Sequence, residues 1–161
     1  MNLARLAAER MEAKGPIGVA VIGAGKFGSM FLAQARLTPG FHVAIIADLN
    51  VGKARESLKA TGWPEEQFGA GGLGDALKSG GTWVTDDSAA IFAAAEIEVV
   101  IDATGHPPAG IRHARLARQA GKHMVMVNVE ADALAGPLLA AEAAEAGTVY
   151  SLAYGDQPAL I

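Results

Sequence analysis

Short apolar runs alternate along the chain with stretches in which apolar residues recur at helical spacing. The runs are nearly continuous in apolar residues, at positions 17–22, 43–47, 97–101, 124–127 and 149–152. Such runs are typical of strands that are covered on both faces in a parallel sheet. Helical spacing lies between them, at positions 27–36, 51–61, 88–95, 110–120 and 131–146. The pattern predicts an α/β fold in three layers: a doubly wound parallel sheet of about six strands, with right-handed crossovers and helices on both faces.

Two segments fall outside this alternation. Residues 1–14 carry apolar residues at helical spacing among charged ones and predict a leading amphipathic helix. The glycine-rich segment 62–87 is interpreted as a flexible insertion with a short helix at 73–78 and a third strand at 82–85. Pro137 is expected in the first turn of the last helix, where its missing N–H costs little. We therefore expect a single domain over residues 15–161.

Composition narrows the class of protein and its partners. With 161 residues, 51% of them hydrophobic and 19% charged, the chain can bury the core of one domain and is not disordered. The net charge of −4 offers no basic surface, so we expect no nucleic-acid partner. No apolar run reaches the roughly 20 residues of a membrane span and no signal peptide is visible, so we expect a cytoplasmic protein with no membrane partner. Cysteine is absent and the four histidines are dispersed, so thiol chemistry is excluded and no metal site is expected.

A glycine motif follows the first strand directly and opens the next helix. Gly23, Gly25 and Gly28 stand in the spacing G-x-G-x-x-G, with Lys26 and Phe27 before the last glycine. In a dinucleotide-binding Rossmann fold the first glycine permits a tight turn and the second lets the backbone approach a pyrophosphate. The third lets the helix lie close to the strand, and the helix N-terminus binds the pyrophosphate.

Asp48 ends the second strand, at the distance from the glycine motif that the fingerprint requires. A carboxylate there can accept hydrogen bonds from an adenosine ribose. The simpler alternative is that Asp48 is only the N-cap of the helix that begins near Val51. Its charge favours NAD over NADP by repelling a 2′-phosphate, but Lys53 or Arg55 could pair with that phosphate, so both cofactors stay open.

Polar residues also follow the fourth and fifth strands. The turn Ala103-Thr104-Gly105 is expected to line the nicotinamide half of a dinucleotide, and Asp102 before it is interpreted as a buried group bonded to a neighbouring turn. His106 is placed for proton transfer, although a loop histidine that points to solvent is the simpler interpretation. Asn128 is expected near the nicotinamide. Glu130 either reaches the site or is a first-turn acid of the last helix.

These motifs together resemble the N-terminal NAD(P)-binding domain of the homoserine-dehydrogenase-like oxidoreductases. The resemblance rests on the fingerprint at 22–28, the turn at 103–105 and the run from Gly121-Lys122-His123 to Asn128, and it covers nearly the whole chain from Gly15. More narrowly, residues 128–137 and 154–160 resemble the branch that carries a C-terminal SAF domain. That branch includes DXR-like 1-deoxy-D-xylulose 5-phosphate reductoisomerases of isoprenoid precursor synthesis.

The resemblance implies an oxidoreductase in which hydride passes between the nicotinamide of NAD or NADP and a substrate carbonyl. Family members continue into a substrate-binding domain, so we expect this chain to be a truncated piece that binds the dinucleotide without turnover. A small-molecule substrate would be held by the missing C-terminal domain, and a homo-oligomer is left open. No catalytic residue is assigned. The expected cofactor contacts are Gly23, Gly25, Lys26, Phe27, Gly28, Asp48, Ala103, Thr104, Gly105 and Asn128.

One departure and two alternatives bear on this reading. Homoserine dehydrogenases usually have lysine directly after the asparagine of the fifth strand, whereas Val129 follows Asn128 here, which puts that activity in doubt. The first alternative is an NAD(H)-sensing regulatory module without catalysis. The second, a methyltransferase that uses S-adenosylmethionine, is disfavoured because the three-glycine spacing and the Thr104-Gly105 turn suit a dinucleotide better.

Overall fold

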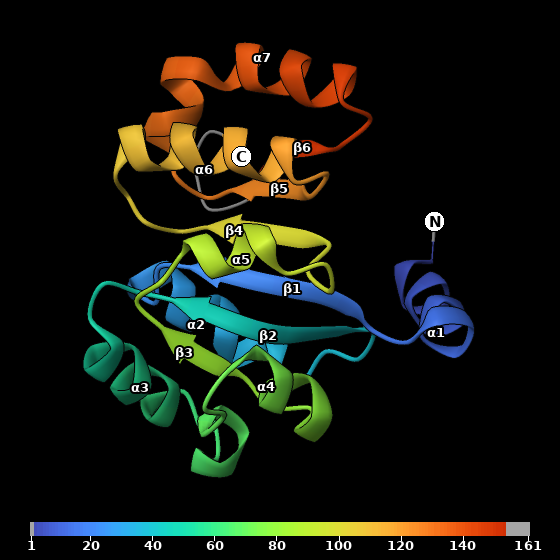
Figure 1. Ribbon diagram of the computed structural model, residues 1–161, viewed down its shortest axis with the longest axis vertical. Helices are drawn as coiled ribbons and strands as arrows, with labels where there is room; N and C mark the ends of the chain where they lie inside the picture. The colour runs from blue at the N-terminus through green and yellow to red at the C-terminus, as the bar shows by residue number, and fades with distance from the viewer. Residues whose placement is uncertain (1, 154–161) are drawn as a thin grey trace.

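The computed structural model describes residues 2–153 and has one six-stranded sheet whose paired strands are all parallel (Figure 1). The strand order is β3-β2-β1-β4-β5-β6, the order of a dinucleotide-binding Rossmann fold. The doubly wound α/β fold predicted from the sequence is confirmed. The strands are β1 (Ile17–Ile22), β2 (Phe41–Ala47), β3 (Trp83–Thr85), β4 (Val99–Asp102), β5 (His123–Met126) and β6 (Tyr150–Leu152).

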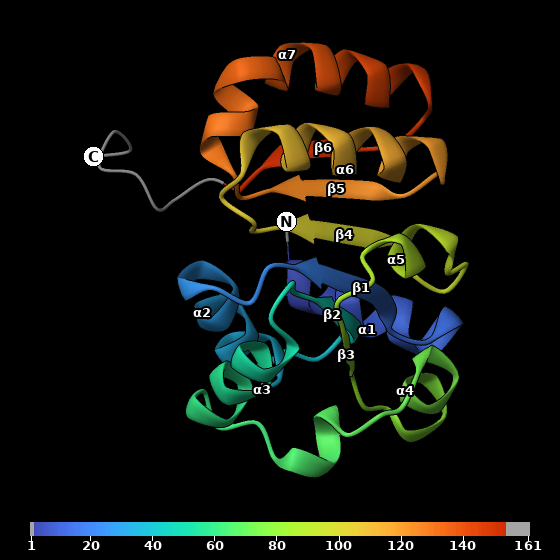
Figure 2. The same cartoon turned by 60° about the vertical axis from the view of Figure 1, so that its left-hand side comes forward.

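Helices cover both faces of the sheet. One group, α2 (Lys26–Ala35) and α3 (Val51–Ala60) with the 3-10 helix η1 (Glu65–Phe68), lies on one face. The other group, α4 (Leu73–Ser79), α5 (Ala89–Ala93), α6 (Pro107–Gln119) and α7 (Val129–Glu145), lies on the opposite face. Figure 2 shows α2 and α3 on one side of β1 to β3, with α4 and α5 on the other.

Burial differs between the two halves of the sheet. Ala44, Ile45 and Ile46 of β2 are fully buried, as expected for a strand covered on both faces. In β5, Met124 and Met126 are buried whereas Val125 is only half-buried, so buried and partly exposed residues alternate. The expectation of two-sided burial therefore holds for β2 and fails for β5. The reason is that α6 and α7 both pack on the same face of this half of the sheet.

The central strand β1 marks the point where the winding of the chain reverses. It pairs with β2 on one side and β4 on the other, and Ile22 at its end lies opposite both Ala47 and Asp102. The chain leaves β1 toward α2 on one face of the sheet and leaves β4 toward α6 on the other face. In open α/β sheets, ligands bind in the crevice that such a reversal creates at the carboxyl ends of the strands.

The glycine-rich segment is anchored to the core, contrary to the expectation of a flexible insertion. Trp63 and Phe68 are buried in the cluster beneath α2 and α3, and the Trp63 indole N–H donates to Leu32 O at 2.9 Å. The Thr82 hydroxyl donates to Val43 O at 2.6 Å and holds the entry to β3 against β2. The short helix and the third strand occur close to their predicted positions, as α4 and β3.

Pro137 lies inside α7 and not in its first turn, so that prediction is wrong. The helix begins at Val129, with Asn128 as its N-cap, and continues through the proline to Glu145. A proline inside a helix removes the hydrogen bond to the carbonyl four residues earlier, which belongs to Ala133. Both Ala133 and Pro137 are exposed, so water can reach the carbonyl that loses its partner.

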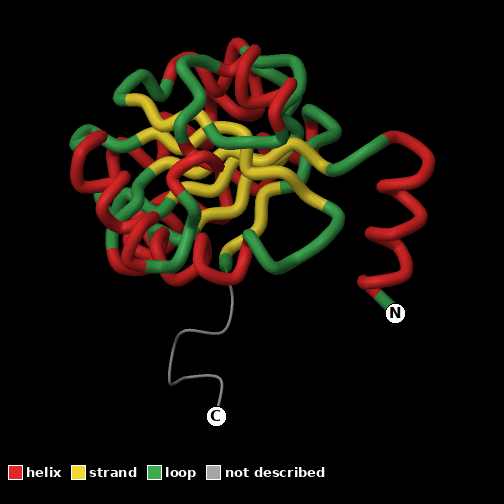
Figure 3. Tube along the Cα trace, turned by 90° about the horizontal axis from the view of Figure 1, so that it is seen from below, coloured by secondary structure: helices red, strands yellow, loops and turns green. Residues whose placement is uncertain are grey.

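The leading helix α1 (Leu3–Lys14) confirms the amphipathic helix expected at the start of the chain. Figure 3 shows it beside the body of the domain, beyond the segment that enters β1. Arg10 donates to the Glu98 carboxylate at 2.8 Å, and Ala7 packs against Gly40, where a β-carbon would lie 2.7 Å from the alanine methyl. Within residues 2–153, none of the helices has the length and apolar character that a membrane crossing requires.

Lys122 is a buried charge at the amino end of β5. It is 5% exposed, and its ammonium donates to Ala94 O at 2.5 Å and to Ile97 O at 2.8 Å. Burial lowers the pKa of this lysine, and the negative charge of Glu96 opposes the shift. The ammonium thus ties the segment between α5 and β4 to the start of β5.

Candidate nucleotide site

Two glycines of the fingerprint are required by the fold itself. Gly23 has φ +96°, and a β-carbon there would lie 2.7 Å from Ala103 O, so the turn after β1 can pass β4 only as glycine. A β-carbon on Gly28 would lie 2.2 Å from Gly23 O, so α2 can lie against the end of β1 only with glycine at this position. Both match the structural roles expected from the motif.

Gly25 differs, because nothing in the described protein requires it to be glycine. Its φ of −68° is open to any residue, and a β-carbon there would have no atom within 4 Å. Gly25 is the N-cap of α2, and the first backbone bond of that helix runs from Ser29 N to Gly25 O at 2.9 Å. The N–H groups before Ser29 have no acceptor within the helix, and helix N-termini of this kind favour anions. The missing side chain leaves room at that site.

Asp48 ties the end of β2 to the glycine loop. Its Oδ2 accepts from Ala24 N at 2.8 Å and its Oδ1 accepts from Asn50 N at 2.8 Å. The N-cap of α3 is Asn50, whose side chain accepts from Lys53 N, so the interpretation of Asp48 as that cap is not what the structure shows. Asp48 is half-buried, and each carboxylate oxygen keeps a free lone pair for a ligand hydroxyl.

A cavity of about 570 Å³ opens at the carboxyl ends of the strands. Five of the expected contact residues line it: Gly23, Gly25, Asp48, Ala103 and Thr104. The other five, Lys26, Phe27, Gly28, Gly105 and Asn128, do not line it. A cavity of similar volume, about 590 Å³, lies under α1 and has mostly apolar walls, with Glu12 as its single charged residue. The polar groups that suit a nucleotide therefore gather in the first cavity.

Several lining residues were missed by sequence reasoning. Leu49 is 97% exposed directly after Asp48, while Asp86 and Ser88 come from the segment between β3 and α5. Arg112 and His113 come from α6. No local motif marks these positions, because only the pairing of β3 with β2 and the packing of α6 on β4 bring them to the glycine loop.

The turn after β4 is held together by the buried Asp102 carboxylate. Oδ1 accepts from Thr104 N at 3.1 Å and from the Thr104 hydroxyl at 2.8 Å, as expected for a group bonded to a neighbouring turn. Gly105 has φ +63°, a conformation that favours glycine. His106 is exposed and is the N-cap of α6, where its Nδ1 accepts from Ala109 N at 3.2 Å. Pro107 and Pro108 follow in the first turn, where proline is tolerated.

The second oxygen of Asp102 is paired with His113, which the sequence analysis did not consider for the site. His113 Nδ1 lies 2.6 Å from Asp102 Oδ2, and both side chains are buried. The imidazole also stacks on Phe92 of α5, with ring centroids 6.0 Å apart. The pair joins α6 to the end of β4, at the wall of the cavity.

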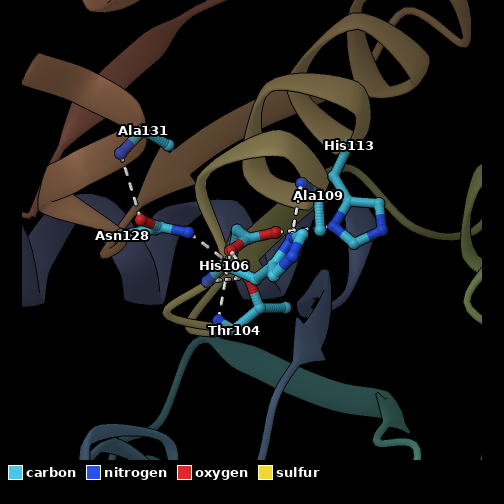
Figure 4. A network of polar contacts seen from close by, with 7 residues as sticks. Thr104, His106, Ala109, His113, Asn128 and Ala131 are labelled. Atoms are coloured by element: carbon cyan, nitrogen blue, oxygen red, sulfur yellow. Dashed lines mark hydrogen bonds and ion pairs between the residues drawn. The ribbon is translucent and has the colours of Figure 1, made fainter. Parts of the chain in front are cut away.

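Asn128 takes part in the same network from the end of β5. It is 2% exposed, its Oδ1 accepts from Ala131 N at 3.1 Å as the N-cap of α7, and its Nδ2 donates to the Thr104 hydroxyl at 3.4 Å (Figure 4). Glu130 is exposed in the first turn of α7, where an acid interacts favourably with the helix dipole. Its proposed role at the site stays a prediction, as does the contact of Asn128 with a ligand.

The first turn of α7 also holds a polar contact with β6. The Tyr150 hydroxyl donates to Asp132 Oδ1 at 2.9 Å, and burial together with this carboxylate raises the pKa of Tyr150 well above its usual value. A β-carbon on Gly136 would lie 2.4 Å from the same oxygen, so this contact needs glycine one turn later in the helix.

Among residues 2–153, no group of three or more histidine and acidic side chains is placed to hold a metal ion.

Comparison with known proteins places the fold. No protein-family model matches the sequence, and no curated protein matches it. Among solved structures, a homoserine dehydrogenase from Thiobacillus denitrificans is 22% identical with a TM-score of 0.60, over 85% of this chain and 29% of the other. Levoglucosan dehydrogenase, solved with NADH and L-sorbose, is 22% identical with a TM-score of 0.62, over 86% of this chain and 34% of the other.

GenD2 from gentamicin A biosynthesis, solved with NAD, is also 22% identical, with a TM-score of 0.60, over 85% of this chain and 34% of the other. The chain spans about a third of the length of these structures. The final segment 154–160, which entered the narrower resemblance in the sequence, lies outside the described residues. At this level of identity the likeness establishes the fold, a Rossmann-type α/β domain.

Proposed function

We propose that this chain is the NAD(P)-binding domain of an oxidoreductase. The observation that carries the proposal is Gly25. Gly23 and Gly28 are needed for folding, but Gly25 leaves open space beside the free N–H groups at the start of α2. A glycine that the fold does not require leaves room for the close approach of a ligand, and a helix N-terminus favours an anionic one.

The chemistry of the cavity fits a dinucleotide. A pyrophosphate at the N-terminus of α2 would meet backbone N–H groups, and Asp48 lies beside it with lone pairs that can accept from ribose hydroxyls. The carboxylate also disfavours a 2′-phosphate, so NAD is the preferred cofactor in this proposal. The neighbours solved with NAD and NADH support the same class of ligand.

Bound nicotinamide would supply hydride exchange with a substrate carbonyl, and the part of the protein is binding and orientation. The turn at Thr104-Gly105 would bound the nicotinamide half, with its position held by Asp102 and by the Asn128 amide. Substrate binding and proton transfer to the alkoxide are not assigned to residues of this chain. The names of the neighbouring dehydrogenases support the oxidoreductase class.

A narrower proposal assigns the chain to the branch with a SAF domain and a DXR-like reductoisomerase activity. Its support is the resemblance of residues 128–137 and 154–160 to the sequences of that branch. The coarser proposal does not depend on it. Extending the protein beyond Ile161 and assaying reduction of 1-deoxy-D-xylulose 5-phosphate with NADPH would test this branch separately.

Calorimetric titration of the 161-residue protein with NADH, NADPH and S-adenosylmethionine tests the proposal directly. We expect saturable binding of both nicotinamide dinucleotides, tighter for NADH, and none of S-adenosylmethionine. Adenosine diphosphate ribose should compete, because it carries the half of the ligand that meets Gly25 and Asp48. Binding of S-adenosylmethionine alone, or of none of these ligands, would overturn the assignment.

A further inference from the structure

The outward side of α7 is apolar along the middle of the helix. No charged residue occurs between Asp132 and Glu142, and Gly136 and Leu139 in this stretch are buried. The exposed residues of the stretch, which we call the α7 face, are Ala133, Leu134, Pro137, Leu138, Ala140 and Ala141. A helix that is apolar on all sides is normally covered on all sides. Figure 2 shows α7 at the edge of the molecule, with α6 beside it and no other described element beyond it.

Leu134 and Leu138 are the largest side chains of the α7 face. They are 71% and 53% exposed, and they lie one helical turn apart, so they are neighbours on the helix surface. The other members of the face are alanines and a proline, whose small side chains let a second helix approach closely. A contiguous apolar surface of this kind is typical of a site where another protein docks.

The charges at the two ends of the α7 face differ. Glu130 is exposed near the start of the helix and forms no ion pair among residues 2–153, whereas Asp132 is engaged by Tyr150. Toward the other end, two partly exposed arginines of α6, Arg115 and Arg118, share the single carboxylate of Glu142 at 2.9 and 3.9 Å. An unpaired acid therefore flanks the face on one side, and a local excess of positive charge flanks it on the other.

These spacings fit a second copy of the same chain, related by a two-fold axis. In an antiparallel pair of α7 helices with the axis midway between Leu134 and Leu138, Leu134 meets the partner's Leu138 and the reverse contact follows by symmetry. Glu130 lies four residues before Leu134, and Glu142 lies four residues after Leu138. The same axis therefore brings Glu130 beside the partner's Glu142, where two arginines outnumber one carboxylate.

The acid at the end of the helix also favours the antiparallel pair. Glu145 is exposed in the last turn of α7. Under the same axis it lies beside the first turn of the partner's helix, where the helix dipole favours negative charge. A parallel pair would instead place Glu130 beside the partner's Glu130 and Glu145 beside the partner's Glu145. Charge complementarity thus selects the antiparallel arrangement.

We propose that the α7 face is the contact surface of a homodimer in which the α7 helices of two copies pack antiparallel. The proposal does not depend on nucleotide binding, because none of the residues that line the nucleotide cavity belongs to α7. With 17 residues, α7 is about 25 Å long, so a pair of these helices forms a small interface. We therefore expect dimers in equilibrium with monomers.

Sedimentation velocity of the 161-residue chain over a hundredfold range of concentration tests the association. The dimer fraction should rise with concentration. Leu134→Lys should remain monomeric over the same range, because it places two charges at the centre of the contact. Leu37→Lys is the matched control, since Leu37 is a 64% exposed leucine that follows α2, and it should associate like the unchanged chain.

Three outcomes of this experiment would overturn the inference. They are an unchanged chain that stays monomeric, which would leave the α7 face to a different partner, a dimer that persists in Leu134→Lys, and an equal loss of dimer in Leu37→Lys. Circular dichroism melting of each variant checks the fold. Both leucines are exposed, so the midpoints should stay close to that of the unchanged protein.

Charge reversal tests the pairing at the ends of the helices. Glu130→Arg and Arg118→Glu should each raise the dissociation constant of the dimer severalfold, because each places like charges together. The double variant should return the constant toward its original value. Arg118→Glu also disturbs the contact with Glu142 inside one chain, but only a contact between copies predicts rescue by Glu130→Arg. A double variant that is no tighter than the single ones would overturn the proposed arrangement.

The direction of packing can be tested separately, because the chain has no cysteine. Proteins carrying Glu130→Cys or Ala141→Cys are oxidised with diamide, each alone and as a mixture. The antiparallel axis brings position 130 of one copy close to position 141 of the other and keeps each position far from its own equivalent. The mixture should therefore form disulfide-linked dimers faster than either protein alone. Faster linkage in the separate proteins would indicate a parallel pair and overturn the inference.

Discussion

The Asp48 carboxylate accepts the backbone N–H of Ala24 at 2.8 Å, so the residue that follows β2 also holds the loop that follows β1. The same carboxylate accepts Asn50 N from the other side. Asp48 therefore shapes the glycine loop as well as lining the cavity. Removing it should affect both the geometry of the loop and the recognition of a ribose.

Asp48→Ala should weaken NADH more than NADPH. Loss of the ribose acceptor should lower the affinity for NADH on the order of tenfold, which is about 1.4 kcal/mol of binding free energy. For NADPH this loss is offset, because the substitution also removes the charge that repels its 2′-phosphate. Titration of both dinucleotides measures the difference. Asp87→Ala is the matched control, since Asp87 accepts Ala89 N in a similar turn and does not line the cavity. An equal loss for both dinucleotides would remove Asp48 from the ribose.

Gly25→Asp should separate binding from folding. Aspartate is a preferred N-cap and finds open space at this position, so the thermal midpoint should stay level or rise. The same carboxylate would occupy the anion site and repel a pyrophosphate, so NADH binding should be lost. Gly28→Ala makes the contrast, because its β-carbon would meet Gly23 O and lower the midpoint. Retained NADH affinity in Gly25→Asp would contradict the placement of the pyrophosphate.

Lys122→Met should destabilise the fold without changing the cavity. The substitution removes both hydrogen bonds of the ammonium and leaves the Ile97 carbonyl without this partner, a loss of about 1–3 kcal/mol in the free energy of unfolding. Urea unfolding measures it. Lys78→Met, at an exposed lysine in the last turn of α4, is the control and should change little.

The stability difference between Lys122 and its methionine variant should depend on pH in a defined direction. Burial lowers the pKa of Lys122 in the folded chain, so the unfolded chain binds more protons between that value and the ordinary one. Stability from this group therefore rises with pH across that interval and is lost as the pH falls through the folded value. Between pH 7 and pH 10, the free energy of unfolding of the unchanged protein should rise relative to that of the variant. The opposite trend would mean that the ammonium is better stabilised than burial alone allows.

The effect of Gly136→Ala on the free energy of unfolding should depend on whether Asp132 is present. Alanine normally stabilises a helix interior by roughly 0.5–1 kcal/mol relative to glycine. Here its methyl would displace the Asp132 carboxylate and break the bond from Tyr150, so the gain should disappear. In an Asp132→Ala background the same substitution should stabilise the chain. Additive effects across the four proteins, measured by urea unfolding, would show that Gly136 and Asp132 are not coupled.

The sequence predicted the structure well where the conformation of a residue depends on its neighbours along the chain. Continuous apolar runs located the strands, and the glycine spacing located the turn at Gly23, whose conformation only glycine adopts readily. The boundaries were less certain. α6 begins earlier than expected because His106 caps it and two prolines suit its first turn, and α7 begins at Val129 because Asn128 caps it.

The residues that sequence reasoning missed depend on contacts between distant elements. Nothing near His113 in the chain reveals that its helix face turns toward Asp102 at the end of β4. Lys122 follows a glycine turn, where an exposed lysine would be expected. Its ammonium instead donates to carbonyls of the segment between α5 and β4. Helix-to-sheet packing determines the surroundings of both residues. The spacing of polar and apolar residues along the chain does not reveal that packing.

The burial of Lys122 also makes the chain suited to chemical footprinting. Of its six lysines, Lys14, Lys26, Lys53, Lys59 and Lys78 are exposed, whereas Lys122 is enclosed with its nitrogen in contact with two carbonyls. An amine-reactive tag added under native conditions should therefore mark the five exposed lysines first. Tagging of Lys122, read by mass spectrometry of its peptide, would then record how often the connection between α5 and β4 opens in the otherwise intact protein.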